Sequence, residues 1–165
     1  MTLKPTIPTV IVPNNMQLTR QVTFESQGFN TTLPQVDYIN PDCYGDDVCR
    51  WLQAQLKSAG YKVEEELGQE DFGWYIQFEV DSIKYCLITQ YRPVRPGVWI
   101  CTLERISGVN LFSFFFGAGQ RHIKIEAAQA LHTILSNNPL IQNIKWYTDQ
   151  EFNKEVDHHS QPELV

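Results

Sequence analysis

The chain has 165 residues, which fits a single domain. Apolar residues make up 42% of it and aromatic residues 12%, which is enough for a hydrophobic core and argues against disorder in the middle of the chain. The formal net charge of -6 argues against an extended phosphate-binding surface, because lysine and arginine supply most nucleic-acid affinity. We therefore expect no nucleic-acid partner.

No targeting or membrane-spanning segment is predicted. The first fifteen residues contain one short apolar run, but Pro5, Pro8 and Pro13 interrupt it and no small-residue cleavage site follows. No stretch approaches the roughly 18 apolar residues that suggest a membrane span. Without a signal peptide, the four cysteines are expected to be reduced thiols. These features favour a cytoplasmic protein with no membrane partner.

The first forty residues predict strands and a loop. Segment 9–12 is a short β-branched run, and in segment 18–25 Leu18, Val22 and Phe24 fall on one face at period two. Residues 26–41 contain only turn formers and isolated apolar residues, so we expect a loop there.

A helix is predicted from Asp46 to about Ser58. Asp46 and its neighbour Asp47 suit the positive end of a helix, and Val48, Leu52 and Leu56 form one apolar face. Gly60 is a natural stop, since glycine adopts left-handed torsions at little cost.

Strands dominate the middle of the chain. Segment 61–67 alternates, and the acidic "EEEL" and "GQED" that overlap and follow it predict a solvated strand end or a turn. In "GWYIQFEV" the side chains of Trp74, Ile76, Phe78 and Val80 share one face. A two-residue turn, Asp81-Ser82, then leads into "IKYCLITQ", which predicts a hairpin of undetermined turn type. After a proline-bound loop, "VWICTLERI" predicts a further strand, and the three neighbouring strands should pair antiparallel.

The last third predicts a helix over 121–136, with an apolar stripe of Ile123, Ala127, Leu131, Ile134 and Leu135. A short final strand is expected in "LIQNIKWYT", followed by a flexible polar tail over 151–165.

These elements predict one α+β domain over residues 1–150, with an extended N-terminal segment over 1–17. Its fold class is a single antiparallel sheet with two helices packed on one face, in the order β-β-α-β-β-β-β-α-β.

An aromatic run, "LFSFFFG", is the first candidate functional segment. If exposed, Phe112, Phe114, Phe115 and Phe116 would form a partner-binding surface or the seam of a homodimer. If buried, the same rings would pack against the sheet as the chain crosses to the second helix. The sequence leaves both readings open.

The Gly117-Ala118-Gly119 turn is the second candidate. Two glycines allow close backbone approach, the following helix would point free amides forward, and Arg121 and His122 add positive charge. This spacing fits an anion site, but it also fits a turn that begins a helix.

The cysteines suggest neither a metal site nor a cofactor. Cys43 and Cys49 lie among aspartates, but Cys-x5-Cys is not a usual zinc spacing. Cys86 and Cys101 lie within predicted strands, where cysteine usually behaves as a small buried apolar residue. An enzyme with Cys43 or His122 at its centre would need a contact between a thiol and a base that the sequence does not reveal.

Charged residues suggest a dipolar surface. Glu64–Glu66 with Glu70 and Asp71 would form an acidic pole, and the opposite pole would consist of Arg92, Arg95, Arg105 and Arg121. The simpler alternative is that the acidic block is a solvated strand end.

Within "AGYKVEEELGQEDFGWYIQFEVDSIKYCLI", residues Asp71 to Trp74 give a D-[FW]-G-W pattern that resembles small bacterial proteins of no assigned role. The resemblance implies an α+β fold and transfers no catalytic residue. We expect a non-enzymatic protein-interaction module, such as an adaptor, regulator or immunity-like partner, that binds another protein or itself as a homodimer. The alternative is a small-ligand or anion-binding domain that uses Gly117, Gly119, Arg121 and His122.

Overall fold

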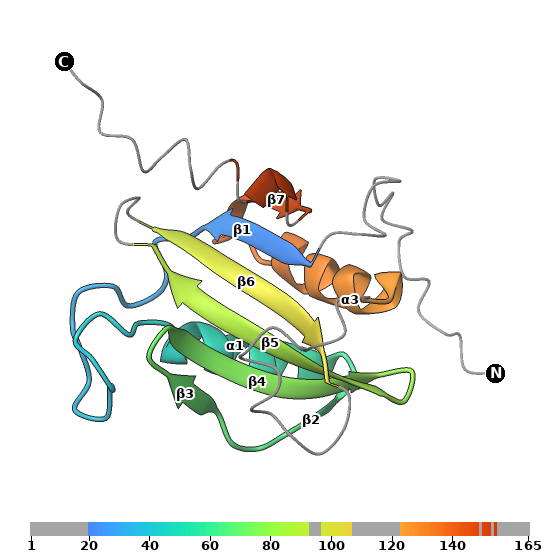
Figure 1. Ribbon diagram of the computed structural model, residues 1–165, viewed down its shortest axis with the longest axis horizontal. Coiled ribbons are helices and arrows are strands. Elements are labelled where there is room, and N and C mark those ends of the chain that lie inside the picture. Colours follow the sequence, from blue (N-terminus) through green and yellow to red (C-terminus); the bar gives the residue numbers. More distant parts are fainter. Residues whose placement is uncertain (1–19, 93–96, 107–122, 149, 153, 155–165) are drawn as a thin grey trace.

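The computed structural model describes residues 20–92, 97–106, 123–148, 150–152 and 154. Within them the chain forms one antiparallel sheet, with α1 (Asp46–Ser58) and α3 (Ile125–Ser136) on one of its faces (Figure 1). The predicted α+β fold class is confirmed. The strands are β1 (Gln21–Glu25), β2 (Lys62–Val63), β3 (Gly68–Glu70), β4 (Gly73–Val80), β5 (Ile83–Tyr91), β6 (Val98–Arg105) and β7 (Gln142–Tyr147).

The strand order is β2-β4-β5-β6-β1-β7, and β3 also pairs with β4. The predicted antiparallel run of β4, β5 and β6 is confirmed. β1 lies between β6 and β7, so the first and the last described strands are direct neighbours. The predicted strand over 9–12 and the extended segment over 1–17 lie outside the described residues.

One face of the sheet and the two helices enclose the main core. The strand side chains that point toward the helices alternate with those that point away, as period two requires. From α1 the core takes Val48, Leu52 and Leu56, the face that the helical spacing predicts, together with Cys49. The strands add fully or almost fully buried side chains: Val22, Phe24, Ile76, Phe78, Tyr85, Leu87, Trp99, Cys101 and Leu103.

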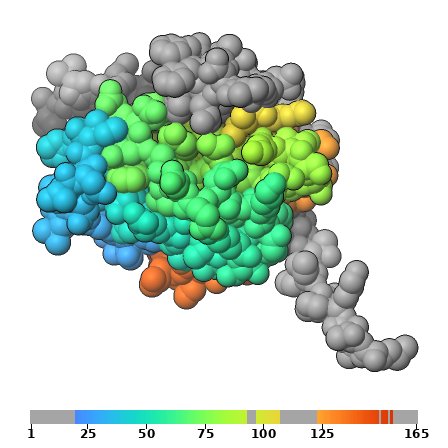
Figure 2. Space-filling view, turned by 90° about the horizontal axis from the view of Figure 1, so that it is seen from below, coloured from blue at the N-terminus to red at the C-terminus, as the bar shows by residue number. Residues whose placement is uncertain are grey.

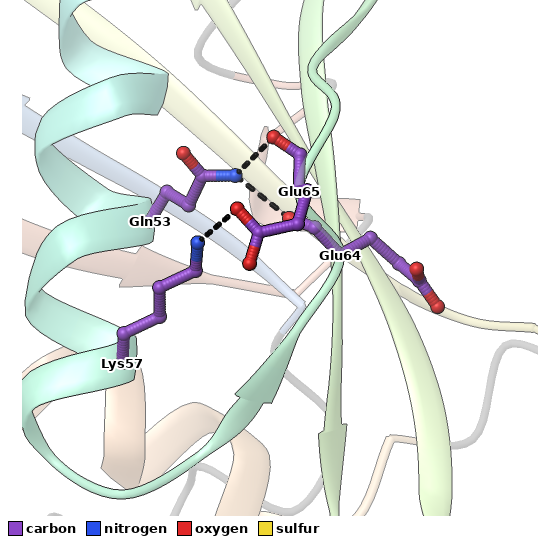
Figure 3. Close-up of polar contacts among 4 residues, drawn as sticks. All are labelled: Gln53, Lys57, Glu64 and Glu65. Atoms are coloured by element: carbon purple, nitrogen blue, oxygen red, sulfur yellow. Dashed lines mark hydrogen bonds and ion pairs between the residues drawn. The ribbon is translucent and has the colours of Figure 1, made fainter.

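The edge beside β4 differs from the prediction. Segment 61–67 is not one strand: β2 ends at Val63, the chain leaves the sheet, and "GQE", expected as a turn, returns as β3. Two side chains of α1 hold this detour (Figure 3). Gln53 donates to the carbonyl oxygens of Glu64 and Glu65 at 2.7 and 3.0 Å, and Lys57 pairs with the Glu65 carboxylate at 2.8 Å.

Gly68 explains why the chain can rejoin β4. A Cβ atom at this position would lie 1.9 Å from the ring of Tyr75, its cross-strand partner. Only glycine leaves room for that ring, so the re-entry of β3 depends on it.

Some helix and turn boundaries differ from those predicted from the sequence. α3 begins at Ile125, because Lys124 is extended, so the predicted start at Arg121 is wrong. In the predicted hairpin, Asp81 and Ser82 both have positive φ, 49° and 63°, as a type I′ turn requires. Residues 150–152, at the start of the predicted tail, are helical, and the ring of Phe152 packs on Tyr147.

Candidate functional site

The loop between β1 and α1, residues 26–45, is long and has no regular secondary structure. Connections beyond about 12–15 residues without structure of their own are uncommon in compact domains and are usually either functional or disordered. Local hydrogen bonds give this one a defined conformation. The side chain of Asn30 accepts from the backbone nitrogen of Leu33 and donates to its carbonyl oxygen. The Tyr38 hydroxyl donates to Asp46 at 2.5 Å.

A second set of contacts fixes the loop against β3 and the start of β4. The amide of Asn40 donates to the carbonyl oxygen of Asp71 at 3.1 Å. The Gln69 side chain, oriented to satisfy both groups, donates to the Asp37 carbonyl and accepts from the Ile39 nitrogen at 2.9 and 3.0 Å. These bonds place Ile39 beside the turn that contains Phe72.

Beneath the loop lies a continuous aromatic cluster. Successive ring centroids are 5.1 to 5.9 Å apart, a spacing typical of stabilising aromatic pairs. The cluster joins the loop to α1 and to strands β4, β5 and β6, and it consists of Trp51, Phe29, Trp99, Tyr91, Tyr44, Tyr38 and Trp74. The loop is therefore anchored on a rigid base.

Despite these anchors, the loop presents apolar side chains to solvent. Leu33, Val36 and Ile39 are each more than half exposed, and Phe72 is 42% exposed. We call these four residues the apolar patch. Figure 2 shows the loop, in blue to cyan, at one end of the molecule. Among the large hydrophobic residues that the structure describes, Leu140 is the other exposed one, and it lies after α3.

The surroundings of the apolar patch are acidic. Residues 26–49 and 68–75, the two segments that meet here, contain no lysine, arginine or histidine. They contain six carboxylates: Asp37, Asp42, Asp46, Asp47, Glu70 and Asp71. Those of Asp37, Asp42 and Asp71 are on exposed residues. Asp47 is partly buried and accepts from the backbone nitrogen of Asn30, and burial raises its pKa above the ordinary value.

The predicted acidic pole divides in two: Glu70 and Asp71 belong to the surroundings of the apolar patch, whereas Glu64 and Glu65 form ion pairs. Glu64 pairs with Lys84 at 3.5 Å, and Glu65 pairs with Lys57. Within the described part of the chain, Glu64 and Glu65 therefore have basic partners, whereas no ion pair joins Asp37, Asp42 or Asp71 to a lysine or arginine. Of the predicted basic pole, Arg92 lies over the ring of Phe152 at 5.4 Å, and Arg95 and Arg121 lie outside the described residues.

The four cysteines are free thiols and all are buried. Burial raises the pKa of each one, to about 12 for Cys101. Cys43 donates to the carbonyl oxygen of Glu70 at 3.4 Å rather than to a base. His132, the described histidine, contacts Trp146 and Ser136, and burial lowers its pKa.

The described residues also line surface hollows, and one of about 300 Å³ lies between the start of the loop and Leu140. Two larger hollows lie elsewhere. One, of about 390 Å³, lies on the surface between α1 and α3 and is lined by residues such as Trp51, Gln55 and Asn137. The other, of about 480 Å³, lies at the detour between β2 and β3. Within the described ranges, no cluster of three or more histidine, cysteine, aspartate or glutamate side chains has the arrangement of a metal site. Nor does that part of the chain contain a helix long and apolar enough to cross a membrane.

The site residues predicted from sequence lie outside the described residues. They are Phe112, Phe114, Phe115, Phe116, Gly117, Gly119, Arg121 and His122, so both hypotheses built on them remain predictions. The apolar patch was not predicted. Its signal in the sequence is faint: isolated apolar residues in a segment whose only charges are acidic.

Comparisons with protein-family models, with curated protein sequences and with solved structures found no match for this chain. The resemblance of Asp71–Trp74 to small bacterial proteins therefore remains a prediction.

Proposed function

We propose that this chain is a non-enzymatic protein-interaction module that binds a basic, apolar segment of a partner protein. The binding surface is the apolar patch together with the carboxylates of Asp37, Asp42 and Asp71. The observation that carries the proposal is the conformation of the loop. Extensive hydrogen bonds order it, yet Leu33, Val36 and Ile39 point to solvent.

Physical chemistry supports this assignment in two ways. Exposed apolar groups with a polar rim are typical of protein-interaction sites. A loop that is already fixed loses little conformational entropy when a partner binds, so more of the contact energy appears as affinity. The carboxylates of Asp37, Asp42 and Asp71 would attract a basic partner and select against an acidic one.

The burial of the thiols supports the non-enzymatic class. A nucleophilic cysteine works as a thiolate and requires a lowered pKa, whereas burial raises the pKa of Cys43, Cys49, Cys86 and Cys101.

A titration followed by nuclear magnetic resonance tests the proposal. A synthetic peptide that alternates leucine and lysine should shift the amide signals of residues 33–42 and 70–72 saturably. A peptide that alternates leucine and glutamate should not. Ile39→Ser or Phe72→Ser should weaken binding about tenfold, because each removes apolar area from the contact. The matched control is Leu140→Ser, which removes an exposed apolar side chain that lies beside Gly28, at the start of the loop and outside the apolar patch.

Charge variants distinguish the electrostatic attraction of the partner from its apolar contacts with the patch. Asp37→Asn with Asp71→Asn should weaken binding and reduce its dependence on salt. Glu65→Gln, in the acidic block that pairs with Lys57, should leave binding unchanged. Equal binding of both peptides, or shifts confined to other residues, would refute the proposal.

The two sequence-based proposals have separate tests. Light scattering of the wild type and Phe115→Ser tests self-association through the phenylalanine run. Thermal stabilisation by phosphate compounds that is lost in Arg121→Ala would support the anion-binding alternative, and no response to any anion would remove it.

A further inference from the structure

The hollow between α1 and α3 has the size of a small-molecule site. Its volume of about 390 Å³ falls within the range of about 300–1,000 Å³ that is common for such sites. One wall comes from the end of α1, between Trp51 and Ala59, and the other from the end of α3 and the residues after it, between Thr133 and Pro139. We call it the helix-end hollow. No residue of the apolar patch lines it, so it is a separate surface.

The helix-end hollow is polar but uncharged. None of its lining residues carries a formal charge, and five of them have amide or hydroxyl side chains. Asn138 uses its side-chain oxygen to accept from the backbone nitrogen of Leu140 at 2.9 Å. The other four side chains make no hydrogen bond within the described part of the chain: Gln55, Ser58, Thr133 and Asn137. Their donors and acceptors are therefore available to a polar ligand.

Two helices end at this hollow. The residues that follow the last turns of α1 and α3 are Ala59 and Asn137, and both line it. The last carbonyl groups of a helix lack intrahelical donors and carry partial negative charge. The last turn of α3 contains no basic residue, and the basic residue in the last turn of α1, Lys57, pairs with Glu65 at 2.8 Å. The negative helix ends therefore favour a positively charged occupant.

An aromatic ring adds a second feature that favours a cation. Trp51 lines the hollow and remains partly exposed, and its ring is supported by Phe29, with ring centroids 5.7 Å apart. Among aromatic side chains, tryptophan attracts organic cations most strongly, because the face of its ring carries negative charge density. The hollow therefore combines an indole ring, two negative helix ends and free amide and hydroxyl oxygens.

From this combination we infer that the helix-end hollow binds a small organic cation that carries N–H donors, such as an alkylguanidinium. The N–H groups pair with the side-chain oxygens of the lining, and the charge lies near the helix ends and the ring of Trp51. A divalent metal ion fits less well, because no carboxylate lines the hollow. An anion would meet the negative ends of both helices. The inference goes beyond the proposed protein-interaction surface and does not depend on it.

A titration of the full chain with butylguanidinium, followed by nuclear magnetic resonance, tests the inference. The indole N–H signal of Trp51 and the amide signals of residues 55–59 and 133–138 should shift saturably. Butylurea has nearly the same shape and also carries N–H donors, but it has no charge, so it should bind about tenfold more weakly. Ile39→Ser, in the apolar patch, should leave the response to butylguanidinium unchanged, which separates this site from the proposed protein-interaction surface.

Charge variants at Asn137, which is exposed and should tolerate substitution, complete the test. Asn137→Lys should abolish the response, because it places a competing cation at the helix end, whereas Asn137→Asp should tighten binding about threefold. The matched control is Glu126→Gln, which changes the net charge as Asn137→Lys does but lies about 16 Å away along α3. It should leave binding unchanged. Equal binding of butylurea, unchanged binding in Asn137→Lys, or shifts confined to other residues would each overturn the inference.

Discussion

The indole nitrogen of Trp74 donates a buried hydrogen bond of 2.7 Å to the backbone carbonyl oxygen of Cys43. Trp74 belongs to β4, and Cys43 is at the end of the long loop that carries the apolar patch. The bond joins two segments that are 31 residues apart in the chain. The position of the proposed binding loop therefore depends on a strand of the central sheet.

Trp74→Phe should lower the free energy of unfolding by about 1–3 kcal/mol, because it leaves the buried carbonyl of Cys43 without its donor. Urea denaturation measures this change. The amide signals of residues 33–39 should also broaden or shift. The control is Trp146→Phe, which removes a hydrogen bond to His132 and should leave the loop signals in place. Unchanged loop signals in Trp74→Phe would show that the loop is ordered without this bond.

Gly73→Ala should destabilise the sheet, since a Cβ atom at this position would lie 2.3 Å from the carbonyl oxygen of Thr89. Relieving that clash must move backbone, so we expect a loss of about 1–3 kcal/mol in the free energy of unfolding. In the control, Gly28→Ala, the nearest atom is the end of the Leu140 side chain at 3.2 Å, which can rotate away. Equal stabilities for the two variants would contradict this close approach of β4 and β5 at Gly73.

Ser82→Gly should stabilise the protein. Ser82 has a φ of 63° in the turn between β4 and β5, a conformation that costs a residue with a Cβ atom about 1 kcal/mol. Glycine removes most of that cost, so thermal and urea unfolding should both move to harsher conditions. Ser136→Gly, at the last residue of α3, should destabilise instead. A destabilising effect of Ser82→Gly would argue against a type I′ turn.

Stability should fall as the solution is acidified through the range in which His132 titrates. Burial lowers the pKa of folded His132 below its ordinary value of 6.5, so the unfolded chain takes up this proton first. The contribution is complete above pH 6.5 and is lost as the pH falls toward the folded pKa. Protonation would also remove the acceptor for Trp146. Urea unfolding from about pH 8 to pH 5 should show a smaller decline in His132→Gln than in the wild type. Parallel declines would refute this assignment.

Local pattern was sufficient to predict the central strands. Trp74, Ile76, Phe78 and Val80 alternate with polar residues, and all four are buried as expected. Period two decides which side of a strand meets the core, so the sequence itself carries this information. The same holds for α1, whose apolar spacing agrees with its buried face.

Features that depend on distant contacts could not be predicted. The split between β2 and β3 follows from hydrogen bonds and an ion pair made by Gln53 and Lys57, which are on a helix rather than in the segment itself. The apolar patch depends on the bonds of Asn40 and Gln69 to other elements. No periodicity in residues 26–45 encodes those contacts, and the position of β7 beside β1 has no local signal either.

The pairing of β1 with β7 also determines when the sheet can be completed during synthesis. On a translating ribosome β1 emerges well before β7, the strand that pairs with its outer edge. Until that strand is released, the nascent sheet carries an open backbone edge of the kind that recruits chaperones or other unfolded chains. A transcript truncated ahead of Gln142 would leave every copy of the protein in that state.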